Sequence, residues 1–180
     1  MEPVVTREGE VFRTDRLLVR RWEPRDEQVL LAVYADPDVV RWVDDGQPLS
    51  PSEAEAWMHV TCQNYVSYGY GMFAIEDRTA VRTIGFGGIV HPGGQTSPEV
   101  KYAFERGAWG RGLATEFVGG LVHHAREVLE LDELIATVAA PNAPSRAVLA
   151  KCGFGIVDER TEGDGSTIVT FAQRISAGAR

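Results

Sequence analysis

The sequence predicts an α/β protein of the mixed α+β type, with one mixed, mostly antiparallel sheet of about six to seven strands and helices on both faces. Residues 72–90 and 154–175 each contain two extended runs joined by a polar or glycine-rich turn, which is typical of antiparallel hairpins. Between them, apolar residues at helical spacing over 113–129 separate two further extended runs, as in a strand–helix–strand unit. A chain that uses both kinds of connection favours one sheet covered on both sides.

In the N-terminal half, residues 1–14 have the character of a loosely held lead-in, and 16–22 predict a first strand. A helix is expected after Pro24. Asp36 followed by Pro37 is typical of an N-cap that opens a short helical turn. A longer helix starts at Ser50-Pro51-Ser52-Glu53, which has the serine and glutamate of a capping box, and it ends at the glycines of 69–71.

The C-terminal half supplies the remaining elements. We expect strands at 72–76, 81–90 and 99–105, followed by a glycine-rich turn and a helix that begins at Leu113. The short apolar run 134–138 predicts a buried central strand. A compact helix at about 144–152 stops at Gly153, and a hairpin of strands 154–160 and 167–175 closes the chain.

Composition bounds the class of protein. A chain of 180 residues, 44% hydrophobic and 24% charged, is typical of one globular domain, expected to span 1–180. The net charge of -8 argues against a nucleic-acid surface, and it would suit a cationic substrate, although solubility alone also explains it. No apolar run approaches the roughly 18 residues of a membrane span, and the N-terminus lacks the features of a signal peptide. We therefore expect a cytoplasmic protein whose two cysteines, Cys62 and Cys152, are buried or half-buried free thiols.

The most informative segment is Arg-Gly-Ala-Trp-Gly-Arg-Gly-Leu-Ala-Thr at 106–115, between a strand and an amphipathic helix. Its glycines let backbone N–H groups approach an anion, and the helix N-terminus adds further donors. Arg111 contributes a positive charge and Thr115 a hydroxyl. A tight turn that merely needs glycine is the alternative interpretation. The segment matches neither the Walker loop nor the dinucleotide fingerprint Gly-x-Gly-x-x-Gly.

Two blocks resemble the GNAT superfamily of N-acetyltransferases. Residues 109–114, Trp-Gly-Arg-Gly-Leu-Ala, resemble its pyrophosphate loop Gln/Arg-x-x-Gly-x-Gly/Ala, although Trp109 departs at the first position. The extended form Trp-Gly-x-Gly-x-Ala-Thr-Glu is similar to the branch that includes ribosomal-protein N-terminal acetyltransferases. Residues 142–154 resemble the family's Asn-x-x-Ser…Lys-x-Gly-Phe segment. Singly, Asn142 could be only an N-cap and Gly153 only a C-cap. The likeness covers about 14–175, the expected domain core.

The resemblance implies acetyl-CoA as cosubstrate and no metal. In that family the loop amides hold the pyrophosphate, and the sheet is splayed at its centre, between strands that match 100–105 and 134–138 here, so that the pantetheine arm enters the gap. Asn142 would then bond the arm, and Arg146 would approach the nucleotide end. The expected cofactor-binding residues are Phe104, Trp109, Gly110, Arg111, Gly112, Leu113, Ala114, Thr115, Asn142 and Arg146.

The implied reaction is attack of a neutral amine on the thioester, with backbone N–H groups of the splayed strand holding the oxyanion. Many family members protonate the leaving thiolate with a tyrosine, where this chain has Leu149. Ser145, one turn earlier, is the candidate donor to the thiolate. Glu99 is the first candidate for the base, and the alternatives are Glu105, His91, Asp44 and Asp45. The adjacent His123 and His124 are expected on the helix surface, where they cannot share a metal.

Three functions remain open at this point. The first is an enzyme that acetylates a primary amine, which could belong to a protein N-terminus, a small metabolite or an antibiotic. The second is an acyl-CoA-binding module without transferase activity, and the third is a nucleotide-binding domain that ignores CoA. Acceptor specificity would lie in residues 22–47 and 53–70, and the chain could be a monomer or a homodimer.

Overall fold

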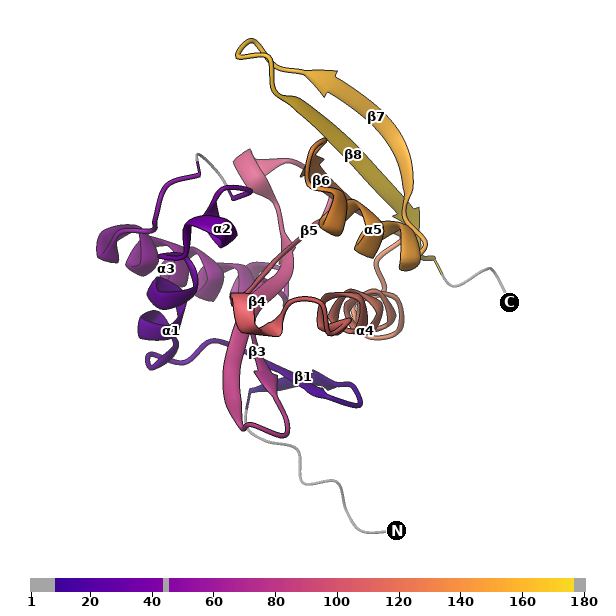
Figure 1. Cartoon of the computed structure of the whole chain (residues 1–180). Coiled ribbons are helices and arrows are strands. Elements are labelled where there is room, and N and C mark those ends of the chain that lie inside the picture. The colour runs from indigo at the N-terminus through magenta and orange to yellow at the C-terminus, as the bar shows by residue number, and fades with distance from the viewer. Residues whose placement is uncertain (1–8, 44–45, 177–180) are drawn as a thin grey trace.

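The computed structural model describes residues 9–43 and 46–176. One sheet holds eight strands in the order β1-β2-β3-β4-β5-β6-β8-β7 (Figure 1). Among the described strands, β5 and β6 alone pair in parallel, and every other neighbouring pair is antiparallel. The predicted mixed, mostly antiparallel sheet is therefore confirmed, with eight strands rather than six to seven. The strands are β1 (Glu10–Arg13), β2 (Leu17–Arg20), β3 (Met72–Asp77), β4 (Arg82–Val90), β5 (Glu99–Phe104), β6 (Glu133–Ala139), β7 (Gly155–Thr161) and β8 (Thr167–Arg174).

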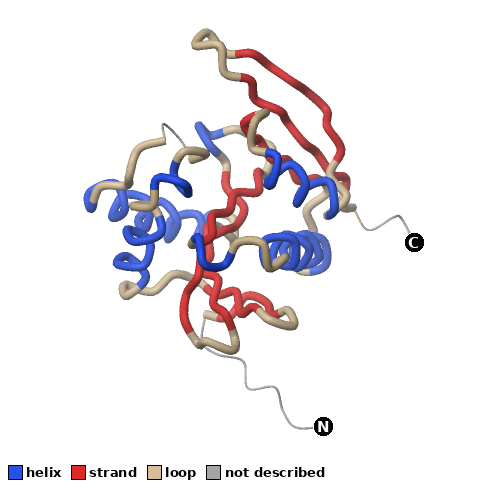
Figure 2. Tube along the Cα trace, viewed as in Figure 1, coloured by secondary structure: helices blue, strands red, loops and turns tan. Residues whose placement is uncertain are grey.

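Helices cover both faces of the sheet. One apolar cluster joins the first three helices to Ala74, Phe86 and Ala103, and a larger cluster joins the last two helices to the opposite face. Figure 2 shows the same division, with one group of helices on each side of the strands. The helices are α1 (Asp26–Val33), α2 (Pro37–Val40), α3 (Pro51–Ser67), α4 (Leu113–Glu127) and α5 (Ala143–Lys151), and short 3-10 turns span Pro92–Gly94 and Arg106–Ala108. In the described part of the chain, no helix combines the length and the apolarity needed to cross a membrane.

The helix starts follow the capping signals in the sequence. Asp36 caps α2, because its carboxylate accepts the N–H of Asp38 at 2.9 Å. Ser50 and Glu53 form the capping box of α3, with each side chain bonded to the other's backbone N–H. Both helices begin with proline, which lacks the N–H that a first turn leaves unpaired.

The lead-in expected at 1–14 is wrong in its last part, because Glu10–Arg13 form strand β1. Phe12 stacks on Phe117 and His124, with ring centroids 6.2 and 5.6 Å apart. Gly120 makes this contact possible, since a Cβ there would lie 2.7 Å from the Phe12 ring. Packing on α4 thus orders a segment whose own four-residue pattern is too short to predict a strand.

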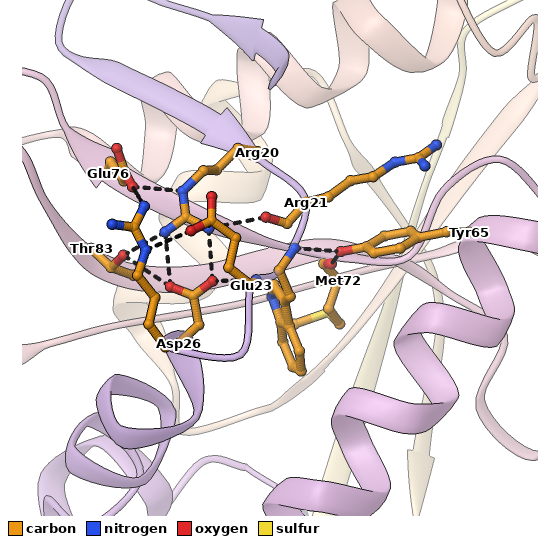
Figure 3. Close-up of polar contacts among 10 residues, drawn as sticks. Arg20, Arg21, Glu23, Asp26, Tyr65, Met72, Glu76 and Thr83 are labelled. Carbon is orange, nitrogen blue, oxygen red and sulfur yellow. Dashed lines mark hydrogen bonds and ion pairs between the residues drawn. The ribbon is translucent and has the colours of Figure 1, made fainter. Parts of the chain in front are cut away.

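A buried ion cluster fastens α1 to the sheet (Figure 3). Arg20, 1% exposed, donates to both carboxylate oxygens of Asp26 at 2.7 and 2.8 Å and to Glu76 at 2.6 Å. Asp26 begins α1 and also accepts the N–H of Glu23 at 2.7 Å. Burial opposes the charge of Arg20, but the hydrogen bonds to Asp26 and Glu76 raise its pKa above the ordinary value. The buried guanidinium of Arg20 is therefore hydrogen-bonded to carboxylates of opposite charge, as the burial of a charge requires.

The last two strands form a hairpin that projects beyond the helices (Figures 1 and 2). β8 pairs with β6 along its whole length, whereas β7 is the outer edge and is exposed at every position. A register shift between Ile156 and Asp158 interrupts the β7–β8 ladder. Charged residues and a bulge are common on edge strands, where they discourage pairing with other chains.

Candidate active site

Strands β5 and β6 separate after a single paired position. The register records Glu99 opposite Ile135 and no further pair, and the N–H of Ile135 donates to the Pro98 carbonyl at 3.0 Å. The N–H of Glu105 points the other way and donates to Ile84 in β4 at 2.9 Å. Because backbone groups alternate between the two neighbours of a strand, those of Val100, Tyr102 and Phe104 face the gap. This is the splayed centre that the resemblance implies.

The side chain of Glu99 takes the place of the next ladder bond. In a regular parallel pair, the N–H of Thr137 would donate to the carbonyl of Val100. Here it donates to Oε1 of Glu99 at 3.2 Å, and the Thr137 hydroxyl binds the same oxygen. The carboxylate therefore ends the pairing of β5 with β6 and lines the start of the gap.

Glu99 is almost completely buried, at 2% exposure, and has further partners. Lys101 Nζ lies 2.5 Å from Oε1, and Gln95 Nε2 donates to Oε2 at 3.0 Å. Burial opposes ionisation, but the charge of Lys101 and the hydrogen bonds from Lys101, Thr137 and Gln95 hold the pKa of Glu99 below its usual value. Glu99 is thus an ionised carboxylate surrounded by donors, and a proton could reach it only as one of them moved aside.

His91 is connected to Glu99 through Gln95. The Gln95 carbonyl only accepts, so His91 Nδ1, 2.9 Å away, donates to it, and Nε2 lies 2.9 Å from the Tyr70 hydroxyl. Tyr68 stacks on the imidazole, with ring centroids 4.5 Å apart. Two of the sequence-derived base candidates thereby lie in one polar cluster at the β4–β5 turn.

The other base candidates lie elsewhere. Glu105 forms a bidentate ion pair with Arg82, at 2.7 and 2.5 Å. Asp44 and Asp45 lie outside the described residues.

At the far end of β5, the predicted loop forms an uncapped helix start. Gly110 and Gly112 both have positive φ, 71° and 75°, which favours glycine. Gly112 is the N-cap of α4 and has no side chain to accept the first N–H groups of the helix. The side chain of Leu113 is buried at 1% exposure, so only its backbone faces the loop. These amides suit an anion: nothing lies within 4 Å of a Cβ built at Gly110.

Basic side chains surround the loop, and one of them was not predicted. Arg16 donates to the Arg111 carbonyl at 2.9 Å and to Glu116 at 2.6 Å, and its Nη2 would lie 3.7 Å from a Cβ at Gly112. The side chain of Arg111 is half exposed and lies 3.4 Å from Asp77. Arg16 comes from the lead-in to β2, about 100 positions away in sequence, so no local motif contains it.

Several predicted cofactor residues have structural partners as well. Trp109 is 47% exposed, and its indole N–H donates to the Phe104 carbonyl at 2.9 Å. The carbonyl of Thr115 accepts from the thiol of Cys152 at 3.4 Å. Arg146 donates to the Ala140 carbonyl at 3.0 Å. Ala114, the remaining loop position, packs against the larger apolar cluster, which joins α4 and α5 to the sheet.

Ser145 lies in the first turn of α5, on the β6 side of the gap. Asn142 caps this helix, because its Oδ1 accepts the N–H of Ser145 at 3.2 Å. Leu149 is fully buried in the core. The hydroxyl of Tyr102, from β5, lies 2.8 Å from Oγ of Ser145. No motif predicted Tyr102; the only signal was strand alternation, which places it on the face opposite Glu99 and Lys101.

A cavity of about 280 Å³ lies among the N-terminal helices, within the region expected to set acceptor specificity. Tyr34 and Trp57 meet there edge to face, with centroids 5.2 Å apart. Tyr34 also packs in the cluster that contains Ala103 of β5. The residues that line the cavity are Tyr34, Val43, Gln47, Pro48, Leu49, Glu53 and Trp57.

Among the described residues, no group of three or more His, Cys, Asp or Glu side chains could hold a metal ion. The prediction that both His123 and His124 are surface residues is wrong for His124, which is 8% exposed under Phe12. Burial lowers its pKa. Cys62 and Cys152 are free thiols, as expected, but the expected burial is wrong for Cys62, which is exposed on α3.

Comparison with known proteins gives matches over most of the chain. Residues 16–155 match the family model described as an acetyltransferase (GNAT) domain. The uncharacterized N-acetyltransferase p20 of Bacillus licheniformis is 28% identical over 148 residues, which cover 81% of this chain and 82% of that protein.

Solved structures share the fold at lower identity. An acetyltransferase from Agrobacterium tumefaciens superposes with a TM-score of 0.79 at 24% identity, covering 91% of this chain and 93% of the other. RimL, a ribosomal L7/L12 alpha-N-protein acetyltransferase solved in complex with coenzyme A, gives a TM-score of 0.78 at 17% identity, over 93% of this chain and 99% of its own.

Proposed function

Since the chain belongs to the acetyltransferase (GNAT) domain family, we propose that it transfers an acetyl group from acetyl-CoA to a primary amine. The observation that carries the proposal is that β5 connects two features, the gap beside β6 and the glycine-rich helix start. The strand leaves its partner β6 after Glu99, and it ends at an uncapped, glycine-rich helix start that suits a pyrophosphate. A gap and an anion site joined by one strand suit a long ligand with a phosphate end.

In this proposal the chain's own groups divide the binding. The amides of residues 111–115 hold the phosphates, with Arg111 and Arg16 as counter-charges. Trp109, Asn142 and Arg146 flank the path between the loop and α5. The backbone groups of Val100, Tyr102 and Phe104 pair with the pantetheine arm by strand addition. Acetyl-CoA supplies the electrophile, a thioester carbonyl.

The chemistry is assigned to the two faces of the gap. N–H groups of β5, including that of Phe104, stabilise the oxyanion, and Ser145 hydrogen-bonds the leaving sulfur on the α4–α5 face. The amine arrives on the opposite face, where Glu99 and Lys101 lie. Glu99 is the proposed base, acting through a water after a donor moves aside, and His91 is the alternative.

For the acceptor we propose a protein N-terminal amine, and a small-molecule amine is the second candidate. The Trp-Gly-Arg-Gly-Leu-Ala-Thr-Glu form of the loop and the fold shared with RimL support the first candidate. The aromatic cavity between α1 and α3, with Glu53 at its edge, would receive an apolar or cationic residue next to the amine in either case.

The test measures thiol release from acetyl-CoA over a panel of amines and N-terminal peptides. Release that depends on the amine supports the transferase. A protein that acetyl-CoA stabilises against heat, but that releases no thiol with any acceptor, would instead be an acyl-CoA-binding module. Acetyl-CoA at about a hundred times its Kd should add about 2.7 kcal/mol to the free energy of unfolding, and ATP or NAD should add none. Acetylation of hydroxyls alone would refute the amine assignment.

A further inference from the structure

One side-chain hydrogen bond crosses the gap on the α4–α5 face. Tyr102 lies in the middle of β5, and its hydroxyl reaches Oγ of Ser145 in α5 at 2.8 Å and the Ser145 carbonyl at 3.4 Å. The proposed function uses the Ser145 hydroxyl but assigns no task to the side chain of Tyr102. The 2.8 Å contact allows either oxygen to be the donor, and the phenol has one hydrogen, so Tyr102 donates to Oγ when that hydrogen points at the nearer of the two acceptors.

Packing holds the tyrosine ring in this direction. Gly87 lies opposite Tyr102 in the β4–β5 ladder, and a Cβ there would lie 2.6 Å from the Phe117 ring and 2.9 Å from Cβ of Tyr102. The space that Gly87 leaves is filled by Phe117, which meets the Tyr102 ring at a steep angle of 62°. Packing therefore holds the Tyr102 hydroxyl in one direction rather than over a range of positions.

The Tyr102–Ser145 hydrogen bond has a chemical consequence, because each hydroxyl has a single hydrogen to donate. A serine hydroxyl has one hydrogen to donate. The Asn142 cap binds the N–H of Ser145 and leaves its hydroxyl hydrogen unused. Burial raises the pKa of Tyr102 to about 12, against the effect of its hydrogen bond with Ser145, so the phenol stays protonated at neutral pH. With Tyr102 as the donor, the hydrogen of Ser145 is available to a third group in the gap.

We propose that Tyr102 is a positioning residue, which donates to Oγ of Ser145 and thereby turns the serine hydrogen towards the sulfur of the thioester. The inference rests on the proposed function. In that reaction the amine nitrogen bonds to the acetyl carbon, the carbon–sulfur bond breaks, and its electron pair stays on sulfur. The amine gives its proton to the base or to solvent. Ser145 stabilises the thiolate by a hydrogen bond until solvent protonates it, so neither hydroxyl loses a proton.

In this proposal, Tyr102 supplies the phenol group that α5 lacks. Leu149 occupies the helix position at which the resemblance expects a phenol, and it is fully buried. Tyr102 brings a phenol to the same side of the gap from β5.

The first test is kinetic. Tyr102→Phe should lower kcat with acetyl-CoA about tenfold, the equivalent of one hydrogen bond of about 1.4 kcal/mol, and leave the KM for acetyl-CoA unchanged. Ser145→Ala should lower kcat by about a hundredfold. The double variant should be no slower than Ser145→Ala, because Tyr102 acts through the serine. Losses that multiply would overturn the assignment.

The second test needs no acceptor amine. The ultraviolet absorbance of the thiolate is titrated with pH for CoA bound to each protein. We expect the pKa of the bound thiol to be lowest in the wild type and about one unit higher in Tyr102→Phe, in Ser145→Ala and in the double variant alike. Equal pKa values in the wild type and Tyr102→Phe, or no binding of CoA, would overturn the proposal.

Tyr65→Phe is the matched control. Tyr65 is also a half-buried tyrosine, but its hydroxyl bonds the N–H of Trp22 and the Met72 carbonyl (Figure 3). This variant should leave the thiol pKa of bound CoA, which is measured without any acceptor, unchanged, with melting temperatures compared for all variants. A wild type that shows the titration pattern but acetylates no amine would refute the proposed function and leave Tyr102 assigned. An active enzyme without the pattern would refute only the role of Tyr102.

Discussion

Gly112 meets two separate requirements, one of backbone conformation and one of space. Its φ of 75° is strained for any other residue, and it caps α4 without a side chain in front of the first amides. Glu99 likewise combines two properties, because it ends the β5–β6 pairing and carries a charge beside the proposed reaction centre. Substitutions at these two residues can separate an effect on folding from an effect on binding or catalysis.

At Gly112, we predict that Gly112→Asp abolishes the thermal shift caused by acetyl-CoA, since it places bulk and negative charge where a phosphate would bind. Gly112→Ala should cost the same backbone strain, about 1–2 kcal/mol, but should retain part of the shift. Differential scanning fluorimetry with and without acetyl-CoA measures both. A full shift in a folded Gly112→Asp protein would remove this loop from the binding site.

The pH–rate profile should report the amine rather than Glu99. The pKa of Glu99 lies below its ordinary value of 4.5, so the carboxylate is already ionised through the neutral range. The rate should therefore rise with pH as the acceptor deprotonates, near pH 8 for an α-amine and near pH 10 for a lysine-like amine, by their ordinary pKa values. Glu99→Gln should lower the plateau without moving this ascending limb. An unchanged plateau in that variant would exclude Glu99 as the base.

Among the elements, α4 is the one that connects the candidate site to the core. Its N-terminus follows the loop, Phe117 packs against Tyr102, and Phe12 of β1 stacks on Phe117 and His124. Two consecutive glycines, Gly119 and Gly120, lie in this helix in different surroundings. A Cβ on Gly119 would meet nothing within 4 Å, whereas one on Gly120 would meet Phe12 at 2.7 Å and Thr14 at 3.0 Å.

This pair of glycines gives a controlled prediction for the helix. Gly119→Ala should stabilise the protein by up to about 1 kcal/mol, the difference in helix propensity. Gly120→Ala gains the same propensity but displaces Phe12, and we expect net destabilisation of about 1–2 kcal/mol. Urea unfolding measures both free energies. If both variants were stabilised equally, β1 would not depend on its contact with α4.

Across the whole molecule, the buried ion cluster joins the parts that must keep their relative positions. Arg20 of β2 binds Glu76 of β3 and Asp26 of α1, and its Nη2 also donates to Thr83 of β4 at 3.2 Å. The proposed acceptor cavity is lined by Tyr34 at the end of α1 and by Glu53 and Trp57 of α3, together with residues 43 and 47–49. The cluster thus fixes α1, and through it one wall of that cavity, to the sheet.

We predict that Arg20→Met lowers the free energy of unfolding by about 3–5 kcal/mol, because it removes the buried guanidinium that both Asp26 and Glu76 bind. Arg25→Met is the matched control: Arg25 also lies near Glu76, at 3.7 Å, but is 57% exposed. Its loss should change stability by at most about 0.5 kcal/mol. Thermal melts at constant ionic strength compare the two. A similar small loss in both variants would show that the cluster contributes little.

Local sequence patterns were sufficient for most elements and for the loop. The capping box of α3, the Asp36 and Asn142 caps and the loop glycines each depend on residues within a few positions of one another. Such short-range rules can be read along the chain. They predicted the helix start at 112–113, where the proposed anion site lies, and Ser145 in the first turn of a helix.

The cross-gap contacts required the tertiary structure. Tyr102 meets Ser145 over 43 positions, Glu99 meets Thr137 over 38, and Arg16 reaches Glu116 over 100. The order of β1 and the burial of His124 likewise follow from packing between distant segments. The physical reason is that a side chain's protonation, aim and burial depend on which distant group completes its hydrogen bonds and excludes water. The sequence by itself therefore predicted a loop suited to the phosphates of an acetyl donor, and only the folded sheet decided which hydroxyl, carboxylate and ammonium lie near one another at the gap.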